Sequence, residues 1–459
     1  MRHPVSDLVL TPDAVTIPGI VDAIVAAISD GRLAESDPLP STRGLAAQLG
    51  CSRTTTVAAY DELAAAGYAV AVAGSRTVVA PGATSAARER IATRFTPTES
   101  ATPSTAIQGL DDPFPLRAGR PDATLINSAD WRRSWRFAAR QPISGDTSWE
   151  CPSTALESAI IDHVRRHRGI VTDRVLLAAG TSAAITTMGA ATGLPAVIED
   201  PGYRRARDAF QLAGSPPLPC PVDDDGLCVD PLPDHACVVY LSPAHQFPMG
   251  TRMSLPRRQR IIEWAHDTGS QLIEDDYDGE FRYGVAPLPA LRSLPGAADV
   301  VTYVGTSSKI LTPSLQAAWI ISPAAIADSL RHELALRRSG VATMTATALA
   351  HFVSTGCLDR HLARAARTYS ARRIALIAAL RRTMPRVVVG GIDAGLHVRV
   401  DLPDDRRVAQ KLVGRGYQVD PVSDSCLSAT ASGLVIGYGC LPETRARDVA
   451  VAIRSVINE

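Results

Sequence analysis

The chain has 459 residues, enough for two or three domains, and 46% of them are hydrophobic, which excludes general disorder. Its formal net charge is zero, so any contact with nucleic acid must come from a local surface and not from the charge of the whole chain. The eight cysteines form no CxxC pair, and no Cys/His cluster has zinc spacing. We therefore expect a reduced, cytoplasmic protein without a metal site.

Three helices followed by a hairpin are predicted near the N-terminus. Each predicted helix shows apolar residues at helical spacing or a Ser/Thr cap, and each ends at a glycine. The predicted helices are 18–31, 40–50 and 52–67. The last two are separated by only a few residues, as in a helix-turn-helix, and 68–80 contain two short β-runs around a Gly-Ser pair. The pattern predicts a winged helix-turn-helix over residues 1–80.

The second helix of such a motif places its first residues at the base edges of the DNA major groove. Here the candidates for DNA contact are Ser52, Arg53, Thr54, Thr55 and Thr56. Arg43 is placed for a backbone phosphate, and Arg76, at the hairpin tip, for a minor groove or a phosphate. Residues 1–80 hold five arginines and eight acids, so a small helical domain with a solvated face remains an alternative.

Residues 81–112 are rich in Ala, Ser, Thr and Pro and predict a linker with about one helical turn. From 113 to 459, strand-like apolar runs alternate with helical patterns, which predicts an α/β domain with a mostly parallel sheet. The runs are 175–180, 195–200, 237–243, 271–276, 300–305 and 317–322. A small α+β subdomain is expected from about residue 360.

The stretch 176–198 has no charged residue and is long enough for a membrane span. Its Gly, Thr, Ser and Pro residues favour a buried strand, turn and helix instead. The N-terminus lacks the apolar core of a signal peptide. We therefore expect no membrane contact.

Lys309 is one of only two lysines among 47 basic residues, and it stands between two serines and an apolar run. A lysine amine can form a Schiff base with an aldehyde, and pyridoxal 5'-phosphate (PLP) is the common aldehyde cofactor. PLP also needs a carboxylate for its ring nitrogen, donors for its phosphate and a flat group to stack on its ring.

Each of these needs has a candidate near the end of a predicted strand. Asp275 could hold the ring nitrogen, Tyr277 could donate to the ring hydroxyl, and Tyr203 could stack on the ring. The candidate phosphate donors are Thr181, Ser182, Thr306 and Ser308. Taken singly, each residue has an ordinary structural explanation, such as an Asp that caps a helix or a Tyr in a core.

Two resemblances to known protein families link the N-terminal helices with the residues around Lys309. The stretch "LPSTRGLAAQLGCSRTTTVAAYDELAAAGY" is similar to the winged helix of GntR-type regulators. The whole of 15–455 resembles the MocR/GabR group of these regulators, through "EDPGYRRAR", "IEDDYDGEFRY", "YVGTSSKILTPSL" and "AGLHV". In that group the large domain is a fold-type I aminotransferase-like PLP domain.

The resemblance implies that Lys309 is the Schiff-base lysine and that His245 lies near the cofactor ring. It also implies a head-to-tail homodimer and paired or repeated half-sites in double-stranded operator DNA. Several positions depart from the group, and at two of them an arginine is lost. Gln316 stands where an arginine usually lies beside the phosphate, and Cys440 where many members have an arginine that grips an amino-acid carboxylate. Arg205 is a candidate substitute, so Arg205 and Cys440 mark the expected effector site.

Three functions follow from these observations. We favour a PLP-binding transcription regulator without sustained turnover, in which the cofactor or a small-molecule effector controls operator binding. One form of this function is a vitamin B6 sensor, whose ligand is PLP itself. The alternatives are an active aminotransferase with an attached DNA-binding domain, and a regulator that has lost PLP.

Overall fold

The structure is a computed structural model that describes residues 12, 15–72, 76–92, 114–143, 153–284 and 289–459. The chain divides into two units, Met1–Gln108 and Gly109–Glu459. Each unit has its own buried apolar side chains and is described separately.

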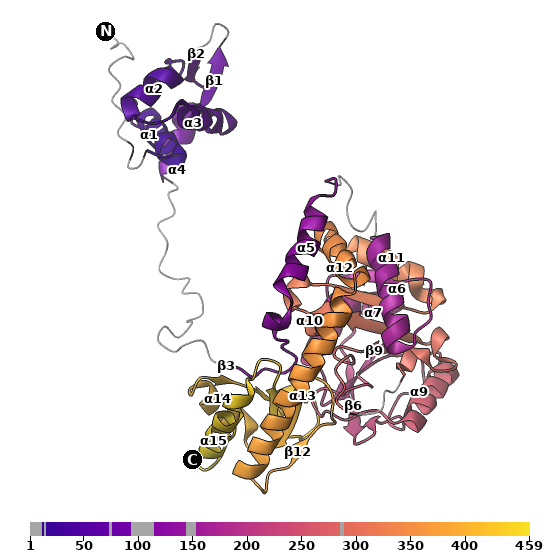
Figure 1. Ribbon diagram of the computed structural model, residues 1–459. Coiled ribbons are helices and arrows are strands. Elements are labelled where there is room, and N and C mark those ends of the chain that lie inside the picture. Colours follow the sequence, from indigo (N-terminus) through magenta and orange to yellow (C-terminus); the bar gives the residue numbers. More distant parts are fainter. Residues whose placement is uncertain (1–11, 13–14, 73–75, 93–113, 144–152, 285–288) are drawn as a thin grey trace. The chain divides into compact units, whose positions relative to one another are not determined.

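The described part of the N-terminal unit consists of helices and one hairpin (Figure 1). The elements are α1 (Ile17–Ser29), α2 (Thr42–Leu49), α3 (Arg53–Ala65), β1 (Ala69–Val72), β2 (Arg76–Val79) and α4 (Ala83–Ala92). The side chains of Ser41 and Ser52 cap α2 and α3 by accepting hydrogen bonds from backbone N–H groups. Gly50 ends α2 in the left-handed conformation, which favours glycine. The predicted winged helix-turn-helix is confirmed.

The start of the predicted linker is a helix, since α4 occupies 83–92 where the composition suggested about one helical turn. Ala83 and Ala87 are buried in the same core as the apolar face of α1. Alanine has the highest helix propensity, and its small side chain lets α4 approach α1 closely. The Ala-rich composition that predicted a linker therefore forms a packed helix at 83–92. Residues 93–112 of the predicted linker lie outside the described residues.

An eight-stranded sheet in the order β4-β11-β10-β9-β8-β5-β6-β7 forms the centre of the large unit. Its strands are β4 (Leu176–Ala178), β5 (Ala196–Asp200), β6 (Leu218–Asp223), β7 (Gly226–Leu227), β8 (Val238–Leu241), β9 (Gln271–Asp275), β10 (Val301–Thr306) and β11 (Ala318–Ile321). The pairs from β10 through β9, β8 and β5 to β6 are parallel, and β11 is antiparallel to β10 and β4. All six predicted runs are strands of this sheet, whereas β6 and β7 were not predicted.

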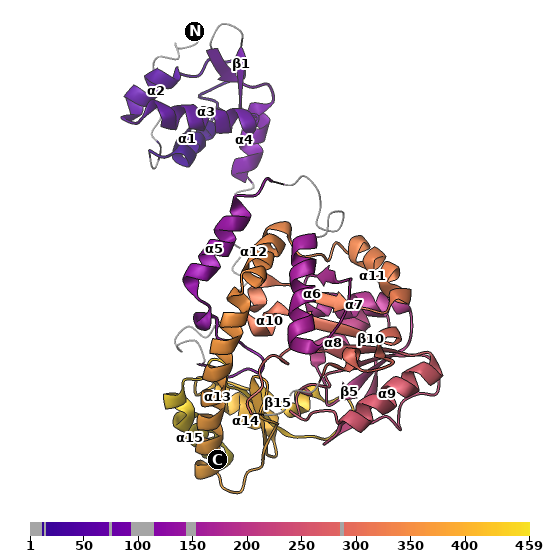
Figure 2. The same cartoon turned by 45° about the vertical axis from the view of Figure 1, so that its right-hand side comes forward.

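Helices cover both faces of the sheet (Figure 2). One face packs against α7 (Thr181–Thr192), α8 (Arg204–Leu212) and α11 (Ala324–Leu336). The other packs against α6 (Thr154–Arg168) and α9 (Leu255–Thr268), and α12 (Thr343–Ser354) links α6 to α5 (Ser128–Ala139). The stretch 176–198 is thus β4, α7 and β5, as expected. No helix in the described ranges combines the length and the apolar character that a membrane span requires.

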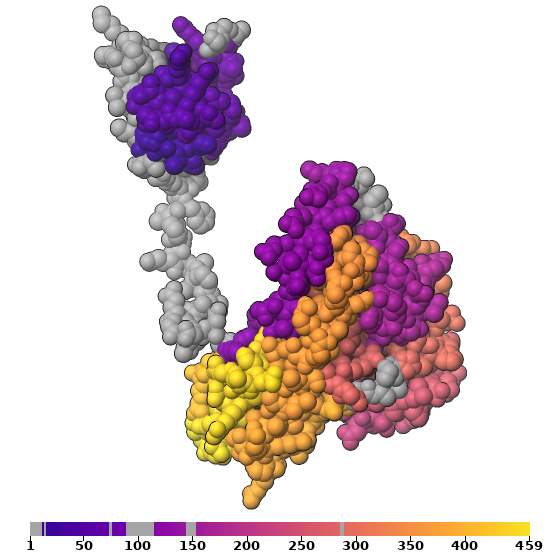
Figure 3. All heavy atoms as spheres, viewed as in Figure 1, coloured from indigo at the N-terminus to yellow at the C-terminus, as the bar shows by residue number. Residues whose placement is uncertain are grey.

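The C-terminal part of the large unit is a smaller α+β layer, as predicted. Its sheet has the order β12-β13-β16-β15 and all its pairs are antiparallel. The elements are α13 (Cys357–Thr383), β12 (Val389–Gly390), β13 (His397–Asp401), α14 (Asp405–Val413), β14 (Tyr417–Gln418), β15 (Asp420–Pro421), β16 (Gly433–Gly437) and α15 (Ala446–Ile457). Strand β3 (Phe114–Pro115) pairs with β14. Figure 3 shows the C-terminal residues, in yellow, against the orange α13, with which α15 packs.

Candidate functional site

Most of the predicted cofactor residues lie at one edge of the large sheet. Parallel strands end on the same side, and β4 has the same direction as β10 because β11 is antiparallel to both. Asp275 ends β9, and Thr306 ends β10 and is followed by α10 (Ser307–Ile310), which carries Lys309. Thr181 follows β4, and Tyr203 follows β5. Topology therefore gathers residues that are far apart in the sequence.

Asp275 is buried and only half satisfied. The Tyr240 hydroxyl donates to its Oδ2 at 2.6 Å, while its Oδ1 has no partner in the part of the chain that the structure describes. Burial raises the pKa of Asp275 to about 6, although Tyr240 and Lys309 favour the charged form. Asp275 is thus mainly a carboxylate at neutral pH, with one oxygen open to a donor. A protonated pyridine nitrogen meets that need.

Tyr240 was not predicted as a site residue. It lies in the buried strand β8 and pairs across the sheet with Ile273, two residues before Asp275, so both side chains leave the same face. A tyrosine inside an otherwise apolar run is the signal that could have found it, because a buried phenol usually needs an acceptor.

Lys309 lies close against the segment that follows β3. A Cβ placed on Gly119, whose φ is +66°, would come within 3.0 Å of the Lys309 Nζ, so glycine leaves room for the amine there. Burial lowers the pKa of Lys309, and Arg205 acts in the same direction, whereas Asp275 opposes the shift. A lowered pKa increases the neutral, nucleophilic fraction of the amine. Gly119 was missed because nothing local in the sequence links it to Lys309.

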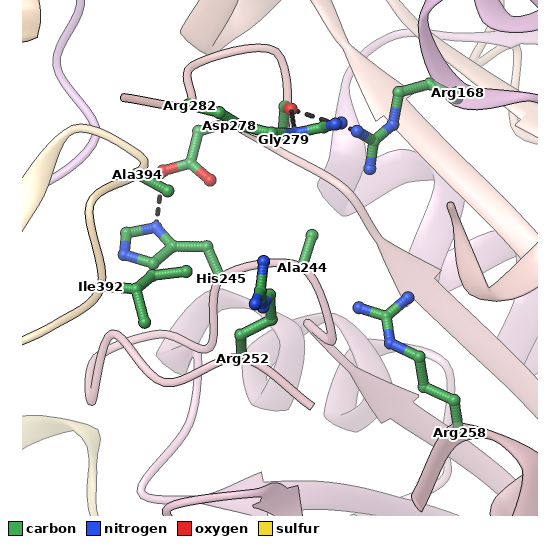
Figure 4. Close-up of a pocket in the computed structure, with 10 residues that line it drawn as sticks. All are labelled: Arg168, Ala244, His245, Arg252, Arg258, Asp278, Gly279, Arg282, Ile392 and Ala394. Atoms are coloured by element: carbon green, nitrogen blue, oxygen red, sulfur yellow. Dashed lines mark hydrogen bonds and ion pairs between the residues drawn. The ribbon is translucent and has the colours of Figure 1, made fainter. Parts of the chain in front are cut away.

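Tyr277 and His245 form a buried pair beside these residues. The Tyr277 hydroxyl, expected to donate to a ring hydroxyl, here donates to the carbonyl oxygen of His245 at 2.8 Å. The His245 Nδ1 lies 3.0 Å from Asp278 Oδ2 (Figure 4), and the rings of His245 and Tyr277 stack. His397, which was not predicted, lies 4.6 Å from His245 between ring centroids. Burial, with His245 nearby, keeps the pKa of His397 well below its usual range.

The first turn of α7 is open to an anion. Gly180 precedes it with φ +97°, and among the described residues no side chain caps this turn. Its backbone N–H groups are therefore free for a phosphate, with Thr181 half-buried and Ser182 exposed. The Thr306 hydroxyl is buried and accepts a hydrogen bond from the Ser308 N–H at 3.1 Å, so it also caps the helix α10. Gln316 is exposed.

Tyr203 and Arg205 lie on the same side as Lys309. The Tyr203 ring is half-buried and meets Phe247 edge to face, with centroids 5.8 Å apart. Burial, with Asp275 nearby, raises the pKa of Tyr203 to about 12, so the phenol is neutral. Arg205 is exposed in the first turn of α8.

Cys440 has different neighbours. Its thiol is half-buried and lies 3.6 Å from the carbonyl oxygen of Pro121. Arg372 reaches this place from α13 and donates to the Gly439 carbonyl oxygen and, at 2.8 Å, to the Asp122 carboxylate. A cation therefore lies beside the position where the group usually has its arginine, but Asp122 already pairs with it. Arg372 was not predicted as a site residue.

A small cavity also lies beside His245 (Figure 4). Its volume of about 20 Å³ suits roughly one water molecule and not a cofactor. Four arginines line it: Arg168, Arg252, Arg258 and Arg282. The candidate cofactor site is thus the edge of the sheet and not this cavity.

The predicted DNA-contacting residues are mostly exposed in the N-terminal unit. The exposed ones are Arg43, Ser52, Arg53, Thr54 and Arg76. Thr55 is half-buried, and its hydroxyl lies 2.8 Å from that of Ser52. Thr56 is fully buried, with its hydroxyl 2.9 Å from the carbonyl oxygens of Thr42 and Arg53. The prediction of Thr56 as a DNA contact is wrong, because the turn of α3 directs this side chain at α2.

Two family models match the chain. Residues 16–79 match the gntR family of bacterial regulatory proteins, and residues 145–433 match aminotransferase class I and II. The second match covers more than half of the chain.

Curated relatives span both units. The chain is 31% identical over 446 residues to the HTH-type pyridoxine biosynthesis transcriptional regulator PdxR of Corynebacterium glutamicum, covering 96% of this chain and 95% of that protein. It is 28% identical to the probable rhizopine catabolism regulatory protein MocR of Rhizobium meliloti, covering 95% and 92%. In fold, it is similar to an archaeal alanine:glyoxylate aminotransferase, with TM-score 0.70 and 21% identity over 76% of this chain and 91% of that one.

Proposed function

Because this chain belongs to the gntR family of transcription regulators, in its MocR-type group with an aminotransferase class I and II domain, we propose that bound PLP controls its DNA binding. PLP, alone or with a small-molecule effector, would act in the large unit. The winged helix-turn-helix would respond by binding or releasing double-stranded operator DNA.

The observation that carries this proposal is the half-satisfied carboxylate of Asp275. Tyr240 holds one of its oxygens, and the other is buried without a partner among the described residues. An unpaired buried acceptor is unfavourable, so a donor is expected to complete it. The protonated ring nitrogen of PLP is a donor of the right charge at the right edge of the sheet.

The neighbouring residues fit the remaining parts of the cofactor. When bound, PLP supplies an aldehyde that condenses with a primary amine, and burial favours the neutral amine of Lys309. The uncapped first turn of α7, with Thr181 and Ser182, would hold the phosphate. Tyr203 would stack on the ring, and Asp278 would orient His245 beside Tyr277.

The effector side of the site favours PLP itself as the sensed ligand. Cys440 cannot grip a carboxylate, and the nearby Arg372 is already paired with Asp122. Gln316 brings no charge to the phosphate. The site therefore gives little support to a ligand recognised through an amino-acid carboxylate. It gives equally little support to sustained amino transfer from such a ligand. The name of the relative PdxR, a pyridoxine biosynthesis regulator, supports a role in sensing vitamin B6.

The proposal includes a homodimer with a head-to-tail arrangement. Two copies of the winged helix-turn-helix would then read paired or repeated half-sites, since two-fold symmetry in the protein matches repetition in the operator.

The test uses absorbance and a matched pair of lysine variants. PLP is added to the full chain, to Lys309→Ala and to Lys411→Ala, which removes the only other lysine, paired with Glu459 at the surface. We expect a visible band that borohydride fixes on the protein in the parent and in Lys411→Ala, and not in Lys309→Ala. A band of equal strength in Lys309→Ala would overturn the assignment.

A further inference from the structure

A second cluster of ionisable side chains lies outside the candidate cofactor site. His163 and His167 come from α6, and Asp359 comes from the first turn of α13. We propose that these three residues bind a transition-metal ion of the Zn²⁺ class. The function proposed above does not depend on this site.

The two histidines are four residues apart on one helix, so their side chains lie on the same face. Their ring centroids are 4.6 Å apart. The His167 Nε2 lies 3.0 Å from Asp359 Oδ1, and one ligand atom from each of the three residues lies within 4.8 Å of the others. Two imidazoles and one carboxylate are a common set of protein ligands for zinc.

The second observation is an unpaired nitrogen on His163. The side chain is fully buried, and its Nε2 lies 3.3 Å from Glu280 Oε1. Because a carboxylate accepts, Nε2 is the nitrogen that donates, and in the neutral imidazole Nδ1 then keeps its lone pair. Nδ1 is buried and has no hydrogen-bond partner within the described ranges. A histidine held by a carboxylate on one nitrogen and open on the other is the usual state of a metal ligand.

The distances are close to those of a tetrahedral site. Bonds of about 2.1 Å at tetrahedral angles place ligand atoms about 3.4 Å apart. The His167 Nε2–Asp359 Oδ1 distance is 3.0 Å, and no pair of ligand atoms is more than 4.8 Å apart, so binding an ion would require only small side-chain adjustments. His167 and Asp359 have 34% and 32% of their side chains exposed, which leaves them room to move and gives a metal ion access.

A metal ion bound here must share the Asp359 carboxylate with a nearby arginine. Arg166 pairs with Asp359, but it uses Oδ2 at 2.6 Å and leaves Oδ1 to face His167. Ligands from His163, His167 and Asp359 leave the fourth position to water. The ion would fasten α6 to the first turn of α13, the helix that continues into the small sheet.

The probe is Zn²⁺ itself, titrated calorimetrically into the full chain after treatment with a chelator. We expect one Zn²⁺ per chain in the parent. In His167→Ala and in Asp359→Asn the affinity should fall by more than the roughly 10- to 100-fold that losing a residue hydrogen-bonded to a metal ligand costs. His235→Ala is the matched control, since His235 is also exposed and lies 3.5 Å from Asp234. Its affinity for Zn²⁺ should equal that of the parent.

A second readout reports the ligands directly. Co²⁺ in a four-coordinate site of nitrogen and oxygen ligands gives a visible band, which should be present in the parent and absent from His167→Ala. Circular dichroism shows whether each variant is folded. Equal Zn²⁺ affinity in the parent, His167→Ala and Asp359→Asn would mean binding elsewhere, for example to thiols, and would overturn the proposal. The absence of stoichiometric binding to the parent would do the same.

Discussion

At the scale of single residues, the charges of Asp275 and Lys309 in the candidate cofactor site depend on how burial shifts their pKa values. Burial raises the pKa of Asp275 to about 6, so this carboxylate takes up a proton more readily than an ordinary aspartate. Tyr240 opposes this shift by donating to Oδ2. Lys309 is shifted in the opposite sense, since burial disfavours its cation. Acid therefore acts on both groups in the same direction, against PLP binding.

We expect PLP affinity to fall as the pH drops through about 6, because Asp275 then takes up a proton and no longer pairs with the ring nitrogen. The measurement is a PLP titration by absorbance from pH 8 to pH 5.5. In Asp275→Asn the step near pH 6 should disappear, and the remaining slope reports Lys309. Tyr240→Phe removes a donor that stabilises the carboxylate and should move the step to higher pH. A step at the same pH in Asp275→Asn would contradict this account.

At the scale of elements, α3 presents one face to solvent and one to α2. Arg53 is exposed at its start, whereas Thr56 is buried three residues later. Only the exposed face is available to DNA. Successive helical residues are turned by about 100° from one another, so the adjacent Thr54, Thr55 and Thr56 face different surroundings.

Arg53→Ala should weaken operator binding by about 1–3 kcal/mol, since an arginine at this place holds a base or a phosphate. The operator is first selected from random duplex DNA, and affinities are compared by fluorescence anisotropy. Arg32→Ala removes an exposed arginine from the same unit, outside α3, and should change affinity less. PLP binding should be the same in both variants. Equal operator affinity of Arg53→Ala and the parent would refute the placement of α3 in the groove.

The helix α4 belongs to the core of the N-terminal unit through Ala83 and Ala87. Ala87→Asp would bury an unpaired charge and should lower the stability of this unit by at least about 2 kcal/mol. Ser85→Asp, at an exposed position of the same helix, should have little effect. Calorimetry of the full chain measures both. If the two variants unfold alike, α4 does not contribute to the core as described.

At the scale of the whole molecule, regulation requires coupling between two separately folded units. A ligand shifts DNA binding only by its difference in affinity for the two states of the protein. Such coupling is reciprocal: if PLP controls DNA binding as proposed, it changes operator affinity by the same factor by which operator DNA changes PLP affinity.

We expect this factor to be about 5- to 150-fold, the range typical of allosteric coupling. Operator titrations with and without PLP give one value, and PLP titrations with and without operator give the other. In Lys309→Ala the factor should fall towards one, because PLP loses its covalent link. A factor of one in the parent would show that PLP binding and DNA binding are independent.

Much of the architecture could be predicted because its signals are local. Helix caps, glycine stops and the alternation of apolar runs with helices identified the winged helix-turn-helix and six strands of the large sheet. The rarity of lysine drew attention to Lys309, and its motif with that of Asp275 indicated the family. These features depend on neighbours in the sequence, so the sequence by itself determined them.

Only the tertiary structure decided which distant residues meet. Tyr240 reaches Asp275 through the pairing of β8 with β9, and Gly119 approaches Lys309 from the start of the large unit. The docking of α4 against α1 and the burial of Thr56 likewise depend on packing between elements. Helical or strand periodicity tells which residues share a face, but not which partner covers that face. Contacts between remote segments arise when the chain packs, and no local pattern encodes them.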